Sequence, residues 1–171
     1  MSVSIILNRF GKRVVKESRT ALTKKKKNAS KRLYNSIGYD LEVHKNSFHL
    51  SFKMEDYGKF IDRGVKGVGG TKTDGSQWKR KKVTNNAFRF RDKRPPTNVF
   101  NGWTIKRGIA PRSKGGQFQK RKSILFALAE TVYRTGIETT DFFTKPFESA
   151  FRDLPNDIIE AYSLEIDTLL K

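Results

Sequence analysis

A chain of 171 residues is long enough for one domain with a hydrophobic core and too short for two domains of ordinary size. Charged residues make up 31% of it and hydrophobic residues only 36%, so we expect part of the chain to lie outside the core. The lack of cysteine excludes disulfides, thiolate metal sites and thiol nucleophiles. The longest apolar run, Ile124 to Ala129, is far shorter than the about 20 residues of a membrane span, so we expect no membrane contact.

The formal charge of +19 is distributed unevenly along the chain. Residues 1–62 hold 14 Lys and Arg against 6 Asp and Glu, residues 63–122 hold 18 against 2, and residues 123–171 hold 4 against 9. Because like charges repel, we expect the middle third to be extended unless something anionic neutralises it.

Residues 3–22 predict an amphipathic helix. Apolar residues such as Phe10, Val14 and Leu22 recur at helical spacing, and basic residues occupy the opposite face. The short apolar run "SVSIIL" is unlike a secretory signal, because basic residues follow it instead of preceding it, so we expect synthesis in a cytoplasm. After "KKKK" at 24–27, Ser30 is predicted to cap a short second helix that reaches Ile37.

Two runs of alternating apolar and polar residues, 39–43 and 48–54, flank the polar turn "HKNS". Alternation with period two across such a turn predicts a β-hairpin with one buried face. Tyr57, Phe60 and Ile61 then return to helical spacing, and Gly64 is predicted to end this short helix.

Residues 64–123 form the segment that we call the basic arm. It is rich in glycine, and its apolar residues occur singly or in short groups, so at most short strands are expected. An irregular segment of this length is unusual inside a compact domain. We therefore expect an extended arm or long hairpin that becomes ordered against partners.

The acidic C-terminal third predicts two helices. The first begins near Ile124 and ends at Gly136, and "DFFTKPFESAF" is predicted to turn around Pro146. Asp153 is then expected to cap a last helix with Pro155 in its first turn.

Enzymatic constellations are nearly absent from the sequence, so we expect no catalysis, no cofactor and no metal. His44 and His49 fall on the polar side of the hairpin, where they are expected to be solvated. The stretch "GVKGVGGTKT" lacks the Gly-Lys-Ser/Thr order of a phosphate-binding loop. A metal-dependent nuclease would need a cluster of acidic residues that the sequence does not show.

The basic arm interleaves cations with aromatic residues, a mixture that can neutralise phosphates and stack on exposed bases. No base-reading motif is present, so we expect contact without sequence specificity. The same cations would also suit an acidic neighbouring protein, or would remain hydrated. The predicted contact residues are Lys79, Arg80, Lys81, Lys82, Arg89, Arg91, Lys93, Arg94, Lys106, Arg107, Lys120, Arg121 and Lys122.

Three motifs in order resemble those of the bacteriophage tail-completion and head-tail joining (neck) family. "SKRLYNSIGYDLEV" resembles the "TG-x-L-x-x-S-I" motif that leads into that family's first strands. "DYGKFIDRGVKG" is similar to its aromatic helix ending in "Y-V-E-x-G-T". "YRTGIETTDFFTKPFESAF" looks like its "G-I-x-x-R-P-F-L-x-P-A-F" segment before the terminal helix.

The resemblance implies an α+β fold: a small curved antiparallel sheet flanked by N-terminal, central and C-terminal helices. The family's loop after the central helix is usually much shorter, so the long extended basic arm is an insertion. We therefore predict a core made of residues 1–63 (N-terminal helices and hairpin) and 124–171 (C-terminal helices), with the inserted arm at 64–123. The residues predicted to pack in the core or to form a seam between subunits are Tyr57, Phe60, Ile61, Phe142, Phe143, Phe147 and Phe151.

The resemblance also implies a structural virion protein that forms a homo-oligomeric ring at the head-tail junction, around the DNA channel. Its expected partners are other neck, portal or tail proteins and, without specificity, the genomic DNA. It would be made in the host cytoplasm and reside in the phage neck or tail. The alternative is a non-sequence-specific nucleic-acid-binding protein of ribosomal or nucleoid type, to which the charge also points.

Overall fold

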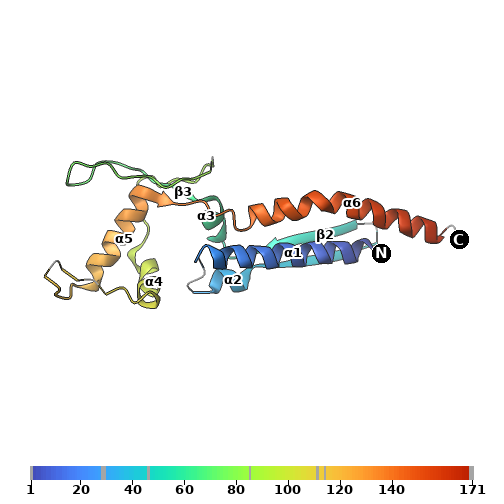
Figure 1. The fold of residues 1–171 in the computed structure, drawn as a ribbon, viewed down its shortest axis with the longest axis horizontal. Helices are drawn as coiled ribbons and strands as arrows, with labels where there is room; N and C mark the ends of the chain where they lie inside the picture. The colour runs from blue at the N-terminus through green and yellow to red at the C-terminus, as the bar shows by residue number, and fades with distance from the viewer. Residues whose placement is uncertain are drawn as a thin grey trace. The chain divides into compact units, whose positions relative to one another are not determined.

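The computed structural model describes residues 2–27, 30–45, 47–84, 86–110, 112–113 and 115–169, with side chains described up to residue 162. The chain forms two compact units. Unit 1 comprises residues 1–58 and 141–171, and unit 2 comprises residues 59–140. Each contains helices and a two-stranded antiparallel sheet, which confirms the predicted α+β class (Figure 1).

Two long helices and a β-hairpin make up most of unit 1. Helix α1 (Val3–Lys24) lies beside α6 (Thr144–Leu169), and β1 (Gly38–His44) pairs with β2 (Ser47–Lys53) (Figure 1). The predicted N-terminal helix is confirmed, and its apolar stripe forms the core with α6. The buried members of this core are Val3, Ile6, Leu7, Phe10, Val14, Ala150, Leu154 and Ala161.

The predicted short second helix is present as α2 (Arg32–Ser36). Lys31 occupies the N-cap position with a φ of 55°. The predicted Ser30 cap is wrong, because no side-chain hydrogen bond caps this helix; the Ser30 Oγ accepts the Arg32 backbone N–H at a long 3.4 Å.

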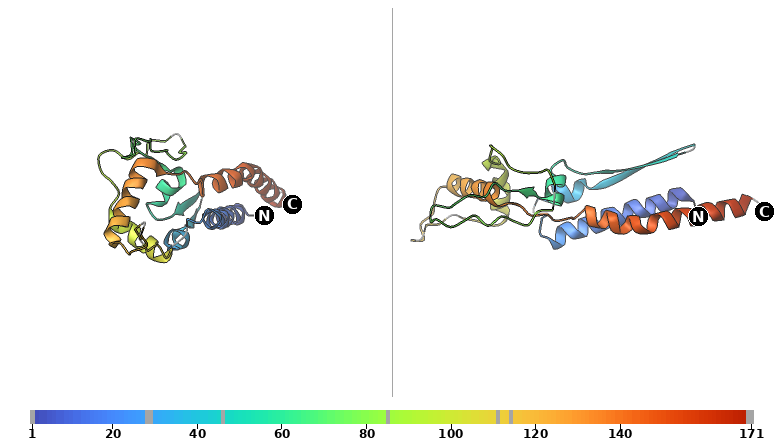
Figure 2. Two further views of the ribbon diagram at one scale, coloured as in Figure 1. Left: turned by 60° about the vertical axis from the view of Figure 1, so that its left-hand side comes forward. Right: turned by 90° about the horizontal axis from the view of Figure 1, so that it is seen from above.

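The predicted hairpin is confirmed, with Leu41 opposite Leu50. Only its half nearest the helices is covered, however. Near the turn, Val43 is 59% exposed and Phe48 is 37% exposed. Figure 2 shows why: the hairpin diverges from α1 toward its turn.

An aromatic cluster joins the hairpin to both long helices. Phe52 of β2 makes edge-to-face contacts with Phe10, Phe143 and Phe147, at ring-centroid distances of 6.0, 5.4 and 5.8 Å. Such pairs add about 0.5–1.5 kcal/mol each beyond the burial of apolar area, so this cluster fixes the packing of unit 1.

The predicted turn around Pro146 and the predicted helix start at Asp153 are both wrong, because α6 runs without interruption from Thr144. Pro146 lies in its first turn, where a backbone N–H has no acceptor within the helix. Pro155 lies inside the helix instead of opening it. Asp153 accepts a hydrogen bond from Arg13 of α1 at 3.0 Å instead of capping a helix.

Unit 2 contains shorter elements joined by long irregular stretches. Its predicted first helix is confirmed as α3 (Gly58–Arg63), ended by Gly64 with a φ of 75°. The other elements are β3 (Val65–Lys66), η1 (Thr97–Phe100), α4 (Asn101–Lys106), α5 (Arg121–Thr135) and β4 (Gly136–Ile137). As expected, the strands here are short.

The division into units differs from the predicted boundaries at residues 63 and 123. Helix α5 belongs to unit 2 and α6 to unit 1, whereas both were expected to complete one core. The physical reason is that the backbone of the basic arm hydrogen-bonds to the end of α5 and so ties that helix to unit 2.

Within the described residues, we find no helix that combines the length and the apolar character of a membrane-spanning segment.

Candidate nucleic-acid interface

The basic arm is organised around the C-terminal end of α5. The backbone N–H groups of Val68 and Gly69 donate to the carbonyls of Tyr133 and Arg134, at 3.0 and 2.9 Å. The N–H of Lys81 donates to the carbonyl of Thr135 at 2.8 Å. The last carbonyls of a helix have no partner within it, so two stretches of the arm cap α5 in place of water.

Two glycines make this close approach possible. A Cβ at Gly67 would lie 2.3 Å from the Arg134 carbonyl oxygen, and a Cβ at Gly136 would lie 2.4 Å from the Val65 carbonyl oxygen. Gly136 also has a φ of 87°, a region that disfavours other residues. The stretch at 64–70, which we call the glycine-valine run, therefore packs against the end of a helix.

The same geometry argues against a phosphate-binding loop in this run. Phosphate loops place their amides at a helix N-terminus, where the dipole favours an anion. Here the amides of Val68 and Gly69 are already bonded, and they lie at the C-terminal end of a helix, which carries partial negative charge.

Two small hairpin turns each carry a cation over an aromatic ring. In the first, Thr71 pairs with Gln77, and the Lys72 ammonium lies 5.3 Å from the Trp78 ring centre. Asp74 lies in this turn, and two hydrogen bonds from Ser76 lower the pKa of its carboxyl group.

In the second turn, Arg112 pairs with Phe118, and its guanidinium lies 4.6 Å from the Phe118 ring centre. Phe118 is 72% exposed, an unusual state for so apolar a side chain. Both turns thus present an aromatic ring beside a cation.

The thirteen predicted contact residues are all exposed. They lie in four places: the stretch 79–82 that passes the end of α5, the irregular stretch 89–94, the end of α4 at 106–107, and the start of α5 at 120–122. Unit 2 as a whole holds twenty Lys and Arg against five Asp and Glu, a formal charge of +15.

Several of the predicted arginines also have structural contacts. Arg94 pairs with Glu130 at 2.7 Å and lies 5.1 Å from the Phe126 ring centre. The Arg80 guanidinium donates to the Val68 carbonyl at 2.8 Å, next to Gly69. These side chains stabilise the fold of the arm, so their charges are partly neutralised or hydrogen-bonded within unit 2.

The lysines beside them are different. Lys79, Lys81 and Lys82 form no ion pair among the described residues. Flexible, hydrated ammonium groups of this kind neutralise phosphates without demanding a fixed geometry. This part of the arm is therefore suited to sequence-independent contact with a polyanion.

Sequence reasoning missed Arg134, which orders the arm from α5. It pairs with Glu130 at 2.8 Å and donates to the Gly69 carbonyl at 3.1 Å. Its four-residue spacing from Glu130 on a predicted helix was the available signal.

The predicted core or seam residues of the C-terminal segment divide by burial. Phe142 is fully buried, and Phe143 and Phe147 are half-buried in the aromatic cluster of unit 1. Phe151 stacks on Phe147 with ring centres 5.8 Å apart, yet it is 50% exposed. Of these four, Phe151 has the most surface left for a partner.

The other three predicted residues lie around α3. Phe60 contacts Phe88 edge to face at 4.9 Å, and the Ile61 carbonyl accepts the Thr140 hydroxyl at 2.7 Å. Tyr57 is 37% exposed, and burial of its hydroxyl is the main cause that raises its pKa.

No group of three or more potential metal ligands occurs among the residues that the structure describes. His44 lies 3.6 Å from Glu42 at the exposed end of the hairpin, a pair that has an ionic character only when the histidine is protonated.

Comparisons with protein-family models, with curated proteins and with solved structures returned no match for this chain. The likeness to the tail-completion family therefore stays a prediction from the three sequence motifs.

Proposed function

We propose that this chain is a structural virion protein of a tailed bacteriophage, a neck or tail-completion component that forms a ring at the head-tail junction around the DNA channel. The observation that carries the proposal is a separation of charge. Unit 2 carries +15, whereas residues 141–171 hold three Lys and Arg against seven Asp and Glu. Opposite charges on different parts of one chain suit contact between identical copies.

Helix α6 offers a surface for such a contact. Phe151, Ile159 and Tyr162 are 50%, 64% and 49% exposed, and their spacing places them along one side of the helix. Acidic residues accompany them, and an apolar stripe with charged neighbours has the composition of a protein interface. In this proposal the stripe faces another copy of the chain.

The basic arm would then be repeated around the ring. Each copy adds the charge of unit 2, and the lysines at 79–82 can contact phosphates without reading a sequence. A ring of such copies surrounds or adjoins DNA with a positive collar. Portal, neck and tail proteins are the other partners that this position requires.

Assembly of the purified full-length protein tests the proposal. We expect native mass spectrometry to find closed oligomers and negative-stain microscopy to show rings. Mass spectrometry of purified virions should find the protein in a fixed ratio to the portal protein. A chain that stays monomeric at every concentration, and that virions lack, would overturn the proposal.

Lys79, Lys81 and Lys82, which form no ion pair among the described residues, favour one alternative, a nucleic-acid-binding protein of ribosomal or nucleoid type. Gel-shift titration across salt concentrations distinguishes the two functions. Nanomolar binding by the monomer to a defined RNA would favour the alternative, whereas weak binding that every sequence shares would favour the ring.

A further inference from the structure

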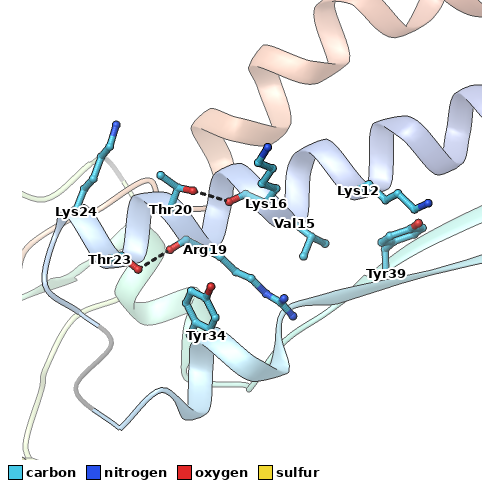
Figure 3. Close-up of a pocket in the computed structure, with 9 residues that line it drawn as sticks. All are labelled: Lys12, Val15, Lys16, Arg19, Thr20, Thr23, Lys24, Tyr34 and Tyr39. Carbon is cyan, nitrogen blue, oxygen red and sulfur yellow. Dashed lines mark hydrogen bonds between the residues drawn. The ribbon is translucent and has the colours of Figure 1, made fainter.

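Unit 1 has a basic groove that is separate from the basic arm. It has a volume of about 480 Å³ and lies between α1, the Tyr34 side chain of α2 and the Tyr39 side chain of β1 (Figure 3). Its charged residues are Lys12, Lys16, Arg19 and Lys24, and none of the acidic residues that the structure describes lines it. Such a lining favours an anionic ligand over an apolar one.

Arg19 is held in place at the centre of the groove. Its guanidinium donates to the Ile37 carbonyl at 2.8 Å and lies 5.3 Å from the Tyr34 ring centre. Its Nε is buried and has no hydrogen-bond partner among the described residues.

Tyr39 forms the far wall through an equally specific contact. A Cβ at Gly11 would lie 2.6 Å from the Tyr39 ring, so only glycine lets this ring lie against α1. The Tyr39 hydroxyl donates to Oδ1 of Asn8, also on α1, at 2.7 Å. The wall is therefore fixed before any ligand binds.

Three lysines on α1 also line the groove. Figure 3 shows Lys12 beside Tyr39, while Lys16 and Lys24 extend from the flank of α1 opposite to Arg19, so that their long side chains must turn toward the groove to reach a ligand. None of the three forms an ion pair among the described residues. By contrast, Arg13 on the same helix pairs with Glu17 and Asp153 and has no such freedom.

We propose that this groove binds the phosphates of a nucleic-acid strand, with Arg19 as its fixed anchor and the three lysines as mobile contacts. The distance argues for several phosphates, because residues 12 and 24 are about 18 Å apart along a helix at about 1.5 Å per residue. One inorganic phosphate would span only a fraction of that length. The proposal goes beyond the phage function and does not depend on it, since the groove lies in unit 1 and needs no second copy.

Lysine footprinting on the full chain tests this site separately from unit 2. The protein is treated with a lysine-acylating reagent, alone and with a single-stranded oligothymidylate, a short DNA duplex, inorganic phosphate or anionic vesicles. Mass spectrometry then reads the modification of each lysine. We expect the oligothymidylate or the duplex to protect Lys12, Lys16 and Lys24, while Lys45 at the hairpin turn stays reactive.

A double variant, Lys12→Gln with Lys16→Gln, provides the binding test. Both side chains are exposed, so the fold should persist, which circular dichroism checks. We expect Lys24 to become reactive again, and the slope of log binding constant against log salt to fall by about 0.7 for each single-strand phosphate that is no longer neutralised. The control, Lys45→Gln with Arg152→Gln, removes the same charge from exposed positions of unit 1 outside the groove.

Three outcomes would overturn the proposal. One is protection of unit 2 lysines without protection of Lys12, Lys16 and Lys24. Another is an equal effect of the double variant and its control, which would indicate general attraction. The third is protection by inorganic phosphate alone or by vesicles alone. Because the ring is tested by assembly and the groove by the protection of its own lysines, failure of the groove and failure of the ring are distinguishable.

Discussion

Single residues decide which parts of the basic arm are fixed and which are available. Arg80, Arg94 and Arg134 bond to carbonyls or to Glu130, whereas the neighbouring Lys79 and Lys81 have no ion-pair partner among the described residues. Arginine presents a rigid fork suited to such contacts, and lysine a compact charge on a flexible stem. The arm therefore uses arginines to hold its shape and leaves lysines exposed.

Gly67 provides a prediction at this scale. Gly67→Ala forces a Cβ toward the Arg134 carbonyl at 2.3 Å, so we expect a loss of about 1–3 kcal/mol in the free energy of unfolding. The matched control is Gly102→Ala in α4, where a Cβ meets nothing within 4 Å. We expect that change to be neutral or to stabilise by at most about 1 kcal/mol. Urea unfolding monitored by circular dichroism measures both, and equal effects would contradict the packing described for the arm.

At the scale of elements, α6 shows how tertiary contacts override a local signal. Proline inside a helix costs about 3 kcal/mol relative to alanine, which is why the sequence predicted a helix start near Pro155. The buried residues Ala150, Leu154 and Ala161 lie on both sides of that proline and pack with α1. The free energy gained by burying these residues offsets the cost of Pro155, so α6 continues past it.

Pro155→Ala tests this balance. The substitution restores a backbone donor toward the Phe151 carbonyl and removes the ring clash, so we expect a gain of about 1–3 kcal/mol in the free energy of unfolding. Pro146→Ala is the comparison: its N–H would lie in the first turn of α6 and restore no bond within the helix, and because Pro146 is buried, whereas Pro155 is exposed, we expect a loss of stability instead of a gain. Thermal unfolding measures both variants. A decrease in stability in Pro155→Ala would show that the proline itself is needed for the packing of α6.

At the scale of the whole molecule, charge is separated along the chain. Unit 2 carries a formal charge of +15. In unit 1, residues 1–58 hold thirteen Lys and Arg against five Asp and Glu, whereas residues 141–171 have an excess of acidic residues. Exposed apolar side chains accompany this acidic excess on α6. Assembly through such a surface depends on both charge and apolar burial.

The two contributions can be separated in the oligomer. Raising the salt shortens the Debye length from about 10 Å at 0.1 M to about 3 Å at 1 M, so we expect the oligomer to dissociate. Ile159→Asp should also favour the monomer at low salt, because it places a charge in the apolar stripe, whereas Ile159→Leu should assemble normally. Analytical ultracentrifugation measures the distribution. An oligomer that resists both salt and Ile159→Asp would place the seam away from α6.

The local sequence pattern was sufficient to predict most of the helices and strands. The periodicity of α1, the alternation of the β1–β2 hairpin and the glycines that end α3 and α5 all act between residues close in sequence. The exposure of the predicted contact residues also follows from their residue type, because lysine and arginine side chains are rarely buried.

What the sequence by itself determined, then, is the α+β class, the order of the early elements and the strongly positive middle of the chain. Only the tertiary structure decided that α5 joins the basic arm, that α6 continues through Pro155, and that Arg19 and Tyr34 meet in a groove. The reason is that these features depend on contacts between residues far apart in sequence, such as Val68 with Tyr133. The free energy of those contacts outweighs the local preferences that a sequence pattern reports.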